Sequence, residues 1–210
     1  SGMVAELAMD GQEASFLGST ERYDAAVLDL GLPELDGISV LKQWREQGGN
    51  FPVLILTGRG RWSDKLAGFG AGADDYLTKP FNPLELVARV KSQLRRYTEL
   101  GNVDSRDNQH LYSVGDLVIN DETKEVQVGG NTVKLTPIEY NILLLLVKNA
   151  GKVFSIDEIY EKIWNEEAIG ADNTVAVHIR HIREKIEINP KEPRYLKVVW
   201  GVGYKVEKKP

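Results

Sequence analysis

The chain has 210 residues, of which 42% are hydrophobic and 27% are charged, and its formal net charge is −5. Such a composition is typical of a globular protein with one or two domains and a sizeable core. The absence of cysteine excludes disulfides and thiolate metal sites, and no apolar run is long enough to cross a membrane. We therefore expect a cytoplasmic protein that has no membrane partner.

The first half of the sequence alternates between short apolar runs and helical patterns. Alternation of this kind predicts a parallel, doubly wound α/β sheet. We expect strands at residues 4–8, 25–29, 52–57 and 76–79, and helices at residues 11–19, 38–47, 64–71 and 83–96.

Three of these strands end on polar residues, namely Asp29, Thr57 and Lys79. The carboxyl ends of parallel strands meet at one edge of a sheet, where ligands bind. A carboxylate there can attack a phosphoryl group, while a hydroxyl and an ammonium can hold the phosphoryl oxygens. The alternative is that each is an independent surface residue. Asp36, in contrast, is expected to cap the helix that follows it.

The first half resembles the receiver domain of bacterial response regulators, which has a flavodoxin-like fold. The resemblance implies that Asp29 accepts a phosphoryl group from a sensor histidine kinase, with Mg²⁺ held by Asp29 and the carbonyl of Gly31. It also implies that Thr57 and Lys79 bind the phosphoryl group and that Tyr76 is the switch aromatic. The motifs that carry it are Val-Leu-Asp29-Leu-Gly-Leu-Pro33-Glu-Leu-Asp36-Gly37, Leu-Thr57 and Gly72-Ala-Asp74-Asp75-Tyr76-Leu-Thr-Lys79-Pro80-Phe81.

The start of the sequence departs from that family. Receivers begin with a strand that ends in an acidic pair and with a helix, whereas this sequence opens at what resembles the second strand. Roughly 25–30 residues are missing by usual element lengths, and in the sheet order 2-1-3-4-5 the missing strand lies between two that are present. Three readings stay open: the segment belongs to the native protein, the receiver is truncated, or another element fills the gap.

Charged residues in the last part of the first half match a face through which OmpR/PhoB-type regulators form symmetric dimers. The resemblance implies a homodimer on phosphorylation, with Lys65 paired to Glu85 and Asp75 paired to Arg89. The alternative is a solvated face whose ion pairs each contribute little. The residues that we assign to the interface are Lys65, Asp74, Asp75, Glu85, Arg89, Lys91 and Arg95.

Residues 98–110 are polar and without periodicity, which predicts a flexible linker between domains at 3–97 and 111–207. Arg outnumbers Lys by seven to four in residues 1–100, whereas Lys outnumbers Arg by eleven to four in residues 101–210. This difference favours a fusion of two domains of separate origin.

The second half predicts three helices followed by a hairpin, the order of an α+β winged-helix domain. Capping boxes begin the first two helices, at Thr136 with Glu139 and at Ser155 with Glu158. We expect strands at 111–119, 125–128 and 132–135, helices at 136–149, 155–164 and 172–186, and a hairpin formed by 195–199 and 204–206.

The third helix has two distinct faces. At about 100° per residue, its Val175, Ile179, Ile182 and Ile186 share an apolar side that we expect in the core. The opposite side carries hydrogen-bonding groups suited to base edges, although a plain solvent face is the alternative. That side holds Asn173, Val177, Arg180 and Glu184, flanked by His181 and Arg183.

This half resembles the DNA-binding domain of OmpR/PhoB-type regulators, with a recognition helix in the major groove and a wing in the minor groove. By that resemblance, phosphates would be held by Trp164, Thr174, His178 and Tyr204, and bases or nearby phosphates would face Val177, Arg180, His181 and Arg183. The motifs are Leu135-Thr136-Pro137-Ile138-Glu139-Tyr140, Asn173-Thr174-Val175-Ala176-Val177-His178-Ile179-Arg180 and Gly201-Val202-Gly203-Tyr204-Lys205.

One position of the wing departs from the family, because Trp200 stands where the wing often carries Arg. Lys197 or Lys205 can take the place of that cation in the minor groove. Trp200 itself is then expected to pack the wing onto the core.

These features predict a phosphorylation-regulated, sequence-specific transcriptional regulator of a two-component system, and not an enzyme. Its partners would be double-stranded DNA and a sensor histidine kinase, with RNA polymerase as a further one. One alternative is a phosphorylation-independent DNA binder with an inactive receiver. Another is an aspartyl-phosphate phosphatase, which would need a second Asp where Gly31 stands.

Overall fold

The computed structural model describes residues 2–58, 67–99, 110–165 and 172–208. The chain divides into two compact units, Ser1–Thr98 and Glu99–Pro210. Within the described residues, no helix combines the length and the apolar character that crossing a bilayer requires.

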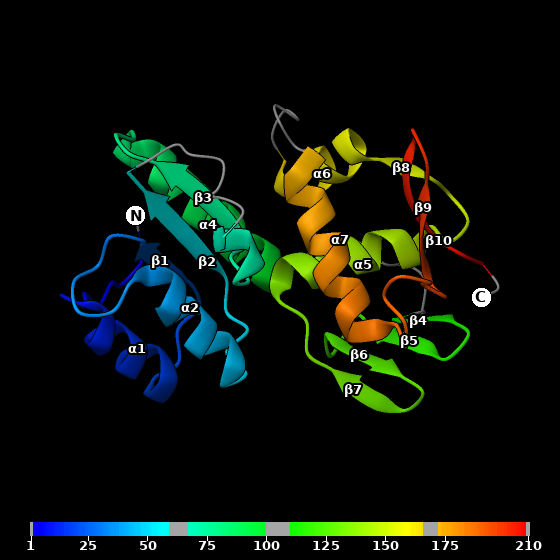
Figure 1. Ribbon diagram of the computed structural model, residues 1–210, viewed down its shortest axis with the longest axis horizontal. Helices are drawn as coiled ribbons and strands as arrows, with labels where there is room; N and C mark the ends of the chain where they lie inside the picture. Colours follow the sequence, from blue (N-terminus) through cyan, green and yellow to red (C-terminus); the bar gives the residue numbers. More distant parts are fainter. Residues whose placement is uncertain (1, 59–66, 100–109, 166–171, 209–210) are drawn as a thin grey trace. The chain divides into compact units, whose positions relative to one another are not determined.

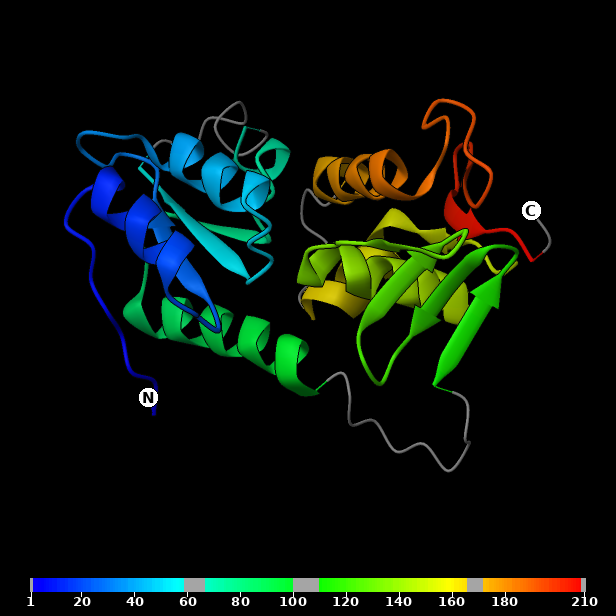
Figure 2. The same cartoon turned by 90° about the horizontal axis from the view of Figure 1, so that it is seen from below.

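The first unit is built on a parallel sheet with helices on both faces. Its strands are ordered β1-β2-β3, and α2 and α4 lie on opposite faces of the sheet (Figure 2). This arrangement confirms the predicted doubly wound α/β fold. The elements are α1 (Gly11–Thr20), β1 (Ala26–Asp29), α2 (Gly37–Glu46), β2 (Val53–Thr57), β3 (Asp75–Thr78) and α4 (Pro83–Glu99), and residues 67–70 are also helical.

Capping and close packing position α1 and α2 against each other. Asp36 caps α2 as expected, because its carboxylate accepts a hydrogen bond from the backbone N–H of Ser39 at 3.1 Å. Trp44 on α2 donates its indole N–H to the carbonyl of Ala14 on α1 at 3.2 Å. A Cβ at Gly18 would lie 2.2 Å from Trp44 Nε1, so only glycine permits this close approach. The position of α2 fixes the loop that leaves Asp29.

The prediction of a strand at residues 4–8 is wrong. This segment forms no strand, and its Val4 and Leu7 are exposed. A strand needs a hydrogen-bonded neighbour, and within the described residues the sheet ends at β1 with no strand beyond it. An apolar alternation therefore did not suffice to form a strand there.

The second unit confirms the winged-helix prediction, with three helices between a four-stranded sheet and a C-terminal hairpin (Figure 1). The sheets are ordered β4-β5-β6-β7 and β8-β10-β9. The elements are β4 (Leu111–Val114), β5 (Leu117–Asn120), β6 (Glu125–Val128), β7 (Asn131–Val133), α5 (Pro137–Lys148), β8 (Phe154–Ser155), α6 (Ile156–Trp164), α7 (Asp172–Ile186), β9 (Leu196–Val199) and β10 (Gly203–Val206).

Both capping boxes are confirmed, at Thr136 for α5 and at Ser155 for α6. The single strand expected at 111–119 is instead a hairpin of β4 and β5, because Gly115 turns the chain with a φ of 59°. A long run of β-forming residues concealed this turn. The core joins all three helices to both sheets and therefore fixes the orientation of α7.

Candidate functional site

The ends of the three parallel strands meet at one edge of the first unit. The register pairs Asp29 with Leu56, Leu56 with Leu77 and Thr57 with Thr78, so Asp29, Thr57 and Lys79 lie within two residues of one level at the carboxyl edge of the sheet. The ammonium of Lys79 donates a hydrogen bond to the carboxylate of Asp29, across 50 residues of sequence. The structure thus brings together two residues that the sequence predicted to converge.

Asp29 is held in its charged form. One carboxylate oxygen accepts the backbone N–H of Gly31 at 3.0 Å, and the other accepts from Lys79. Partial burial opposes the charge, but these two donors outweigh it and hold the pKa of the Asp29 carboxyl below its usual value. A carboxylate that is ionised and about one-third exposed is available as a nucleophile.

Thr57 and Tyr76 flank this pair on neighbouring strands. Thr57 is buried at the end of β2, and its carbonyl accepts the backbone N–H of Lys79 at 2.8 Å. Tyr76 is half-buried on β3 and meets the ring of Phe69 edge-on, at 5.6 Å between centroids. The peptide bond between Lys79 and Pro80 is cis. Thr57 therefore lies on β2, next to β1, and Tyr76 lies on β3, one strand further along the sheet.

The oxygen donors for a divalent cation are few. Within the described part of the chain, no three His, Cys, Asp or Glu side chains gather as metal ligands. Asp29 supplies a carboxylate, and Gly31 follows it closely enough to bond the same side chain. Mg²⁺ keeps several waters and uses one or two carboxylates plus phosphate oxygens, so this donor set fits a water-rich Mg²⁺ site.

The structure corrects one member of the predicted dimer face. Asp74 is only 1% exposed and bonds Arg45 of α2 and the backbone of β2, whereas Asp75, although only 5% exposed, bonds Arg89 of α4 on the predicted face. The carboxylate of Asp74 accepts from the guanidinium of Arg45 at 3.1 Å and from the backbone N–H of Val53 at 2.8 Å. Asp74 is therefore a buried anion that links α2 to β2 within the first unit.

The predicted ion pair of Asp75 with Arg89 exists, but it forms within one chain. The guanidinium of Arg89 bonds the carboxylate of Asp75 at 3.0 Å and that of Glu85 at 3.2 Å. Lys91 is exposed on the same helix, α4. Lys65 and the side chain of Arg95 lie outside the described residues.

The two faces of α7 are arranged as predicted. The four apolar residues of its inner side, Val175, Ile179, Ile182 and Ile186, are all buried. On the outer side, the side chain of Arg180 is 75% exposed and pairs along the helix with Glu184, at 2.8 Å. Asn173 is exposed and Val177 is half-buried beside it. The helix thus offers a hydrogen-bonding surface on an anchored scaffold.

Three residues predicted to bind phosphates are buried instead, and these are Trp164, Thr174 and His178. The rings of Trp164 and His178 lie 5.6 Å apart, and Tyr160 stacks on Trp164 at 4.8 Å. Burial lowers the pKa of His178 to about 3, so this imidazole is neutral at physiological pH. A neutral, 1% exposed imidazole packs α6 against α7 and is not a phosphate ligand.

The flanking residues of α7 connect it to its surroundings. Arg183 donates its Nε–H to the carbonyl of Leu196 at 3.0 Å, and its guanidinium lies 6.0 Å from the ring centre of Tyr204. His181 is mostly buried, 3.8 Å from the carboxylate of Glu139. Burial lowers the pKa of both His181 and Arg183. Glu139, expected only as a capping residue, also pairs with Lys185 of α7 at 2.6 Å.

The wing, defined here as residues 196–206, overturns one further expectation. Trp200 does not pack onto the core, because it is 87% exposed in the turn between β9 and β10. Its neighbour Gly201 has a φ of 72°, and the turn closes with Val202 N–H donating to Val199 at 2.9 Å. A tight turn of this kind directs its corner side chains into solvent.

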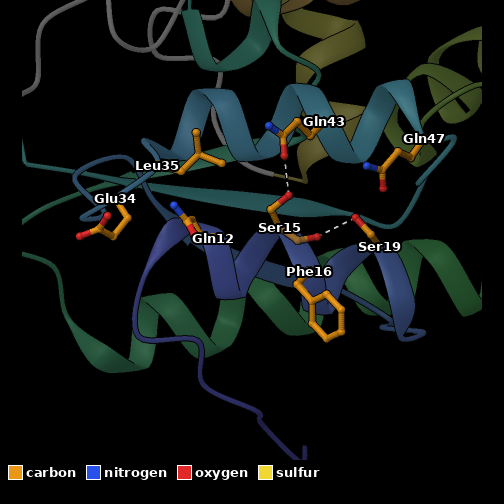
Figure 3. A pocket seen from close by; sticks show the side chains of 8 residues that line it. All are labelled: Gln12, Ser15, Phe16, Ser19, Glu34, Leu35, Gln43 and Gln47. Atoms are coloured by element: carbon orange, nitrogen blue, oxygen red, sulfur yellow. Dashed lines mark hydrogen bonds between the residues drawn. The ribbon is translucent and has the colours of Figure 1, made fainter.

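A separate shallow groove of about 530 Å³ lies between α1 and α2 (Figure 3). Ser15 Oγ of α1 donates to Gln43 Oε1 of α2 at 2.5 Å and so joins the two walls, and Ser19 Oγ donates to the Ser15 carbonyl within α1 at 2.6 Å. The lining contains none of the residues predicted for phosphorylation, dimerisation or DNA binding. It consists of Gln12, Ser15, Phe16, Ser19, Glu34, Leu35, Gln43 and Gln47.

Comparison with known proteins covers both units. Residues 1–91 match the family model of the response regulator receiver domain, and residues 130–206 match that of the transcriptional regulatory protein, C terminal. The chain is 44% identical to the regulatory protein VanRc of Enterococcus gallinarum, over 95% of this chain and 86% of that protein. It is 42% identical to the alkaline phosphatase synthesis transcriptional regulatory protein PhoP of Bacillus subtilis, over 99% and 88%. A solved structure of a RitR mutant matches with a TM-score of 0.71 and 26% identity, over 97% and 87%.

Proposed function

We propose that this chain, which belongs to the two-component response regulators of the OmpR/PhoB group, binds specific DNA sequences under the control of phosphorylation at Asp29. Members of this family are transcriptional regulators that combine a receiver with a DNA-binding domain. The observation that carries the proposal is the direct contact of Lys79 with Asp29 at the carboxyl edge of the sheet. We place the receiver at residues 3–97, the linker at 98–110 and the DNA-binding domain at 111–207, in a cytoplasmic protein.

The phosphoryl chemistry follows from this geometry. A carboxylate oxygen of Asp29 attacks the phosphorus of a phosphohistidine on the partner kinase, and the phosphorus–nitrogen bond breaks as the ring, protonated at its other nitrogen, leaves as neutral imidazole. Phosphorylation removes the negative charge of the Asp29 carboxylate, and the ammonium of Lys79 then pairs with the phosphoryl oxygens. Thr57 would hold the same group, and Tyr76 would follow its movement. Asp29 and the Gly31 carbonyl would hold Mg²⁺, which supplies neutralisation of phosphoryl charge when it is bound.

Phosphorylation would shift the protein toward a homodimer through the face formed by α4 and its neighbours. That face would contain Lys65, Asp75, Glu85, Arg89, Lys91 and Arg95, without Asp74. The phosphoryl group must favour the pairing state over the free state to have this effect. In the dimer, the intrachain pair of Asp75 and Arg89 would be available for exchange across the two-fold axis, since a symmetric contact uses each pair twice.

DNA recognition would use the outer face of α7 in the major groove. Asn173, Val177 and Arg180 project from that face, and a guanidinium suits the two acceptors on guanine. His181, Arg183, Tyr204, Lys197 and Lys205 border the same surface, and RNA polymerase is a further partner of the bound regulator. Because a dimer doubles the phosphate contacts, its affinity should fall steeply with salt concentration.

Intact mass spectrometry of the full chain, before and after acetyl phosphate with Mg²⁺, tests the acceptor. We expect the wild type to gain one phosphoryl group and Asp29→Ala to gain none. Asp36→Ala is the matched control, since it removes a nearby capping carboxylate and leaves Asp29 in place. A wild type that gains no mass would support a phosphorylation-independent DNA binder.

Fluorescence anisotropy with a duplex selected from a random pool by the full chain tests the reader. Arg180→Ala should abolish the preference for the selected sequence, and Arg194→Ala should not. Arg194 is an exposed arginine outside α7 that pairs with Asp116 at 3.1 Å. Equal specificity in the wild type and in Arg180→Ala would contradict the role of α7.

A further inference from the structure

The turn of the wing exposes an apolar surface that the fold does not need. Trp200 is 87% exposed and Val202 is 56% exposed, on the three-residue connection between β9 and β10. The hairpin register closes beneath them, with Val199 opposite Gly203 and Val198 opposite Tyr204. A large aromatic at a hairpin corner costs favourable burial, so an exposed tryptophan here indicates a contact surface.

The wing holds this tryptophan in a fixed place relative to α7. Arg183 bonds the carbonyl of Leu196 at the base of β9, and its guanidinium lies against the ring of Tyr204 on β10. β10 also pairs with β8, where a Cβ at Gly203 would lie 1.9 Å from the carbonyl oxygen of Phe154. The recognition helix and the wing therefore form one rigid surface, and Trp200 lies at its tip.

The lysines of the wing have other partners in this structure. Lys197 donates its ammonium hydrogen bond to the carbonyl of Pro193. Lys205 pairs with Glu207 at 2.9 Å. Lys197 and Lys205 lie opposite each other in the hairpin, two residue pairs below the pair of Val199 and Gly203 that closes the turn. The group that projects from the tip is thus an indole and not a cation.

The indole is chemically suited to the minor groove of the duplex. The minor groove of an A·T pair presents only acceptors, at adenine N3 and thymine O2, whereas a G·C pair adds the guanine N2 amino donor. The indole has a single N–H donor on a flat apolar ring, and apolar side chains are inserted into the minor groove by other DNA-binding proteins. A ring with one donor would therefore favour A·T pairs and be opposed by guanine.

We propose that Trp200 is the specificity-determining residue of the wing and that it reads A·T pairs in the minor groove beside the site of α7. This inference rests on the proposed DNA recognition by α7. The contact is uncharged, so it adds sequence preference without adding an ion pair.

The test measures affinity of the full chain for a duplex that the wild type has selected. Trp200→Ala should weaken binding roughly tenfold, the scale of one aromatic–base contact, and should leave the salt dependence unchanged because no ion pair is lost. Trp200→Phe, which keeps a ring and lacks the donor, should lose the preference for A·T over G·C. Leu111→Ala is the control, because Leu111 is an exposed apolar residue on the separate β4 sheet.

Substitution with inosine distinguishes a contact in the minor groove from one in the major groove. Each A·T pair flanking the α7 site is replaced in turn by G·C and by inosine·cytosine, whose minor groove lacks the guanine amino group. At the position under the wing, the wild type should lose affinity with G·C and regain it with inosine·cytosine, and Trp200→Ala should not distinguish the three. If Trp200→Ala binds as tightly as the wild type while Arg180→Ala loses specificity, the wing inference fails alone. If the wild type selects no duplex, the proposed DNA recognition fails with it.

Discussion

Replacement of His178 by a residue that does not titrate should remove a pH dependence from the stability of the second unit. The ring is 1% exposed between α6 and α7, and burial lowers its pKa to about 3 from 6.5. As the pH falls below 6.5, the unfolded chain takes up a proton that native His178 does not bind. The free energy of unfolding therefore decreases on acidification, by about 1.4 kcal/mol per pH unit once the pH is well below 6.5.

This relation gives a magnitude for the experiment. Between pH 7.5 and pH 5.5, His178 should cost the wild type about 1.4 kcal/mol of stability, and His178→Phe and His178→Gln should both lack this loss. Urea unfolding is followed in the full chain by ¹⁹F NMR of 5-fluorotryptophan, because the resonance of Trp164 reports on the neighbouring ring. Using two variants keeps the test valid if one of them packs poorly.

The reasoning would be refuted if both variants kept the pH dependence of the wild type. That result would mean that native His178 binds protons like a solvent-exposed imidazole and could contact phosphates. His110→Gln is the control, because His110 is exposed just before β4, and it should behave as the wild type does.

Three further changes give expected outcomes. Arg45→Ala should destabilise the first unit by about 3–5 kcal/mol in urea unfolding, since it leaves the carboxylate of Asp74 buried without its cation, and Asp74→Asn should cost less. Lys79→Met should raise the pKa of the Asp29 carboxyl in an NMR titration, because the ammonium that favours its charged form is gone, and an unchanged value would contradict the pairing. Asp121→Asn should destabilise the second unit at neutral pH, because the Asp121 carboxylate accepts hydrogen bonds from Lys124, Lys148 and Tyr140. The difference in stability between wild type and variant should shrink as the pH falls past the lowered pKa of Asp121, where the wild-type carboxylate is protonated.

The sequence predicted features that depend on local chemistry. Strand ends on Asp29 and Lys79 predicted their convergence because the ends of parallel strands share an edge, and Thr136 and Ser155 marked helix starts through their own hydrogen bonds. The apolar spacing of α7 identified its buried side through residues such as Ile179. In each case the signal lies within a few residues or in one fixed period.

What the sequence did not predict depends on partners distant in the chain. The pair of Arg45 and Asp74 buries a charge that looked suited to a surface, since 29 residues separate its members. His178 looked like a phosphate ligand until its contact with Trp164 placed it between two helices. Trp200, which stands where the family often has Arg, was expected to pack the wing onto the core, yet the turn that contains Gly201 leaves it 87% exposed.

The most direct test of the account is the affinity of the full chain for its selected duplex, measured with and without acetyl phosphate and Mg²⁺, in the wild type and in Asp29→Ala. We expect phosphorylation to increase the affinity of the wild type, because it favours the paired state, and to leave Asp29→Ala unchanged. Intact mass in the same samples verifies that the wild type carries its phosphoryl group. A wild type that is phosphorylated and yet binds DNA with unchanged affinity would contradict the control of DNA binding by Asp29.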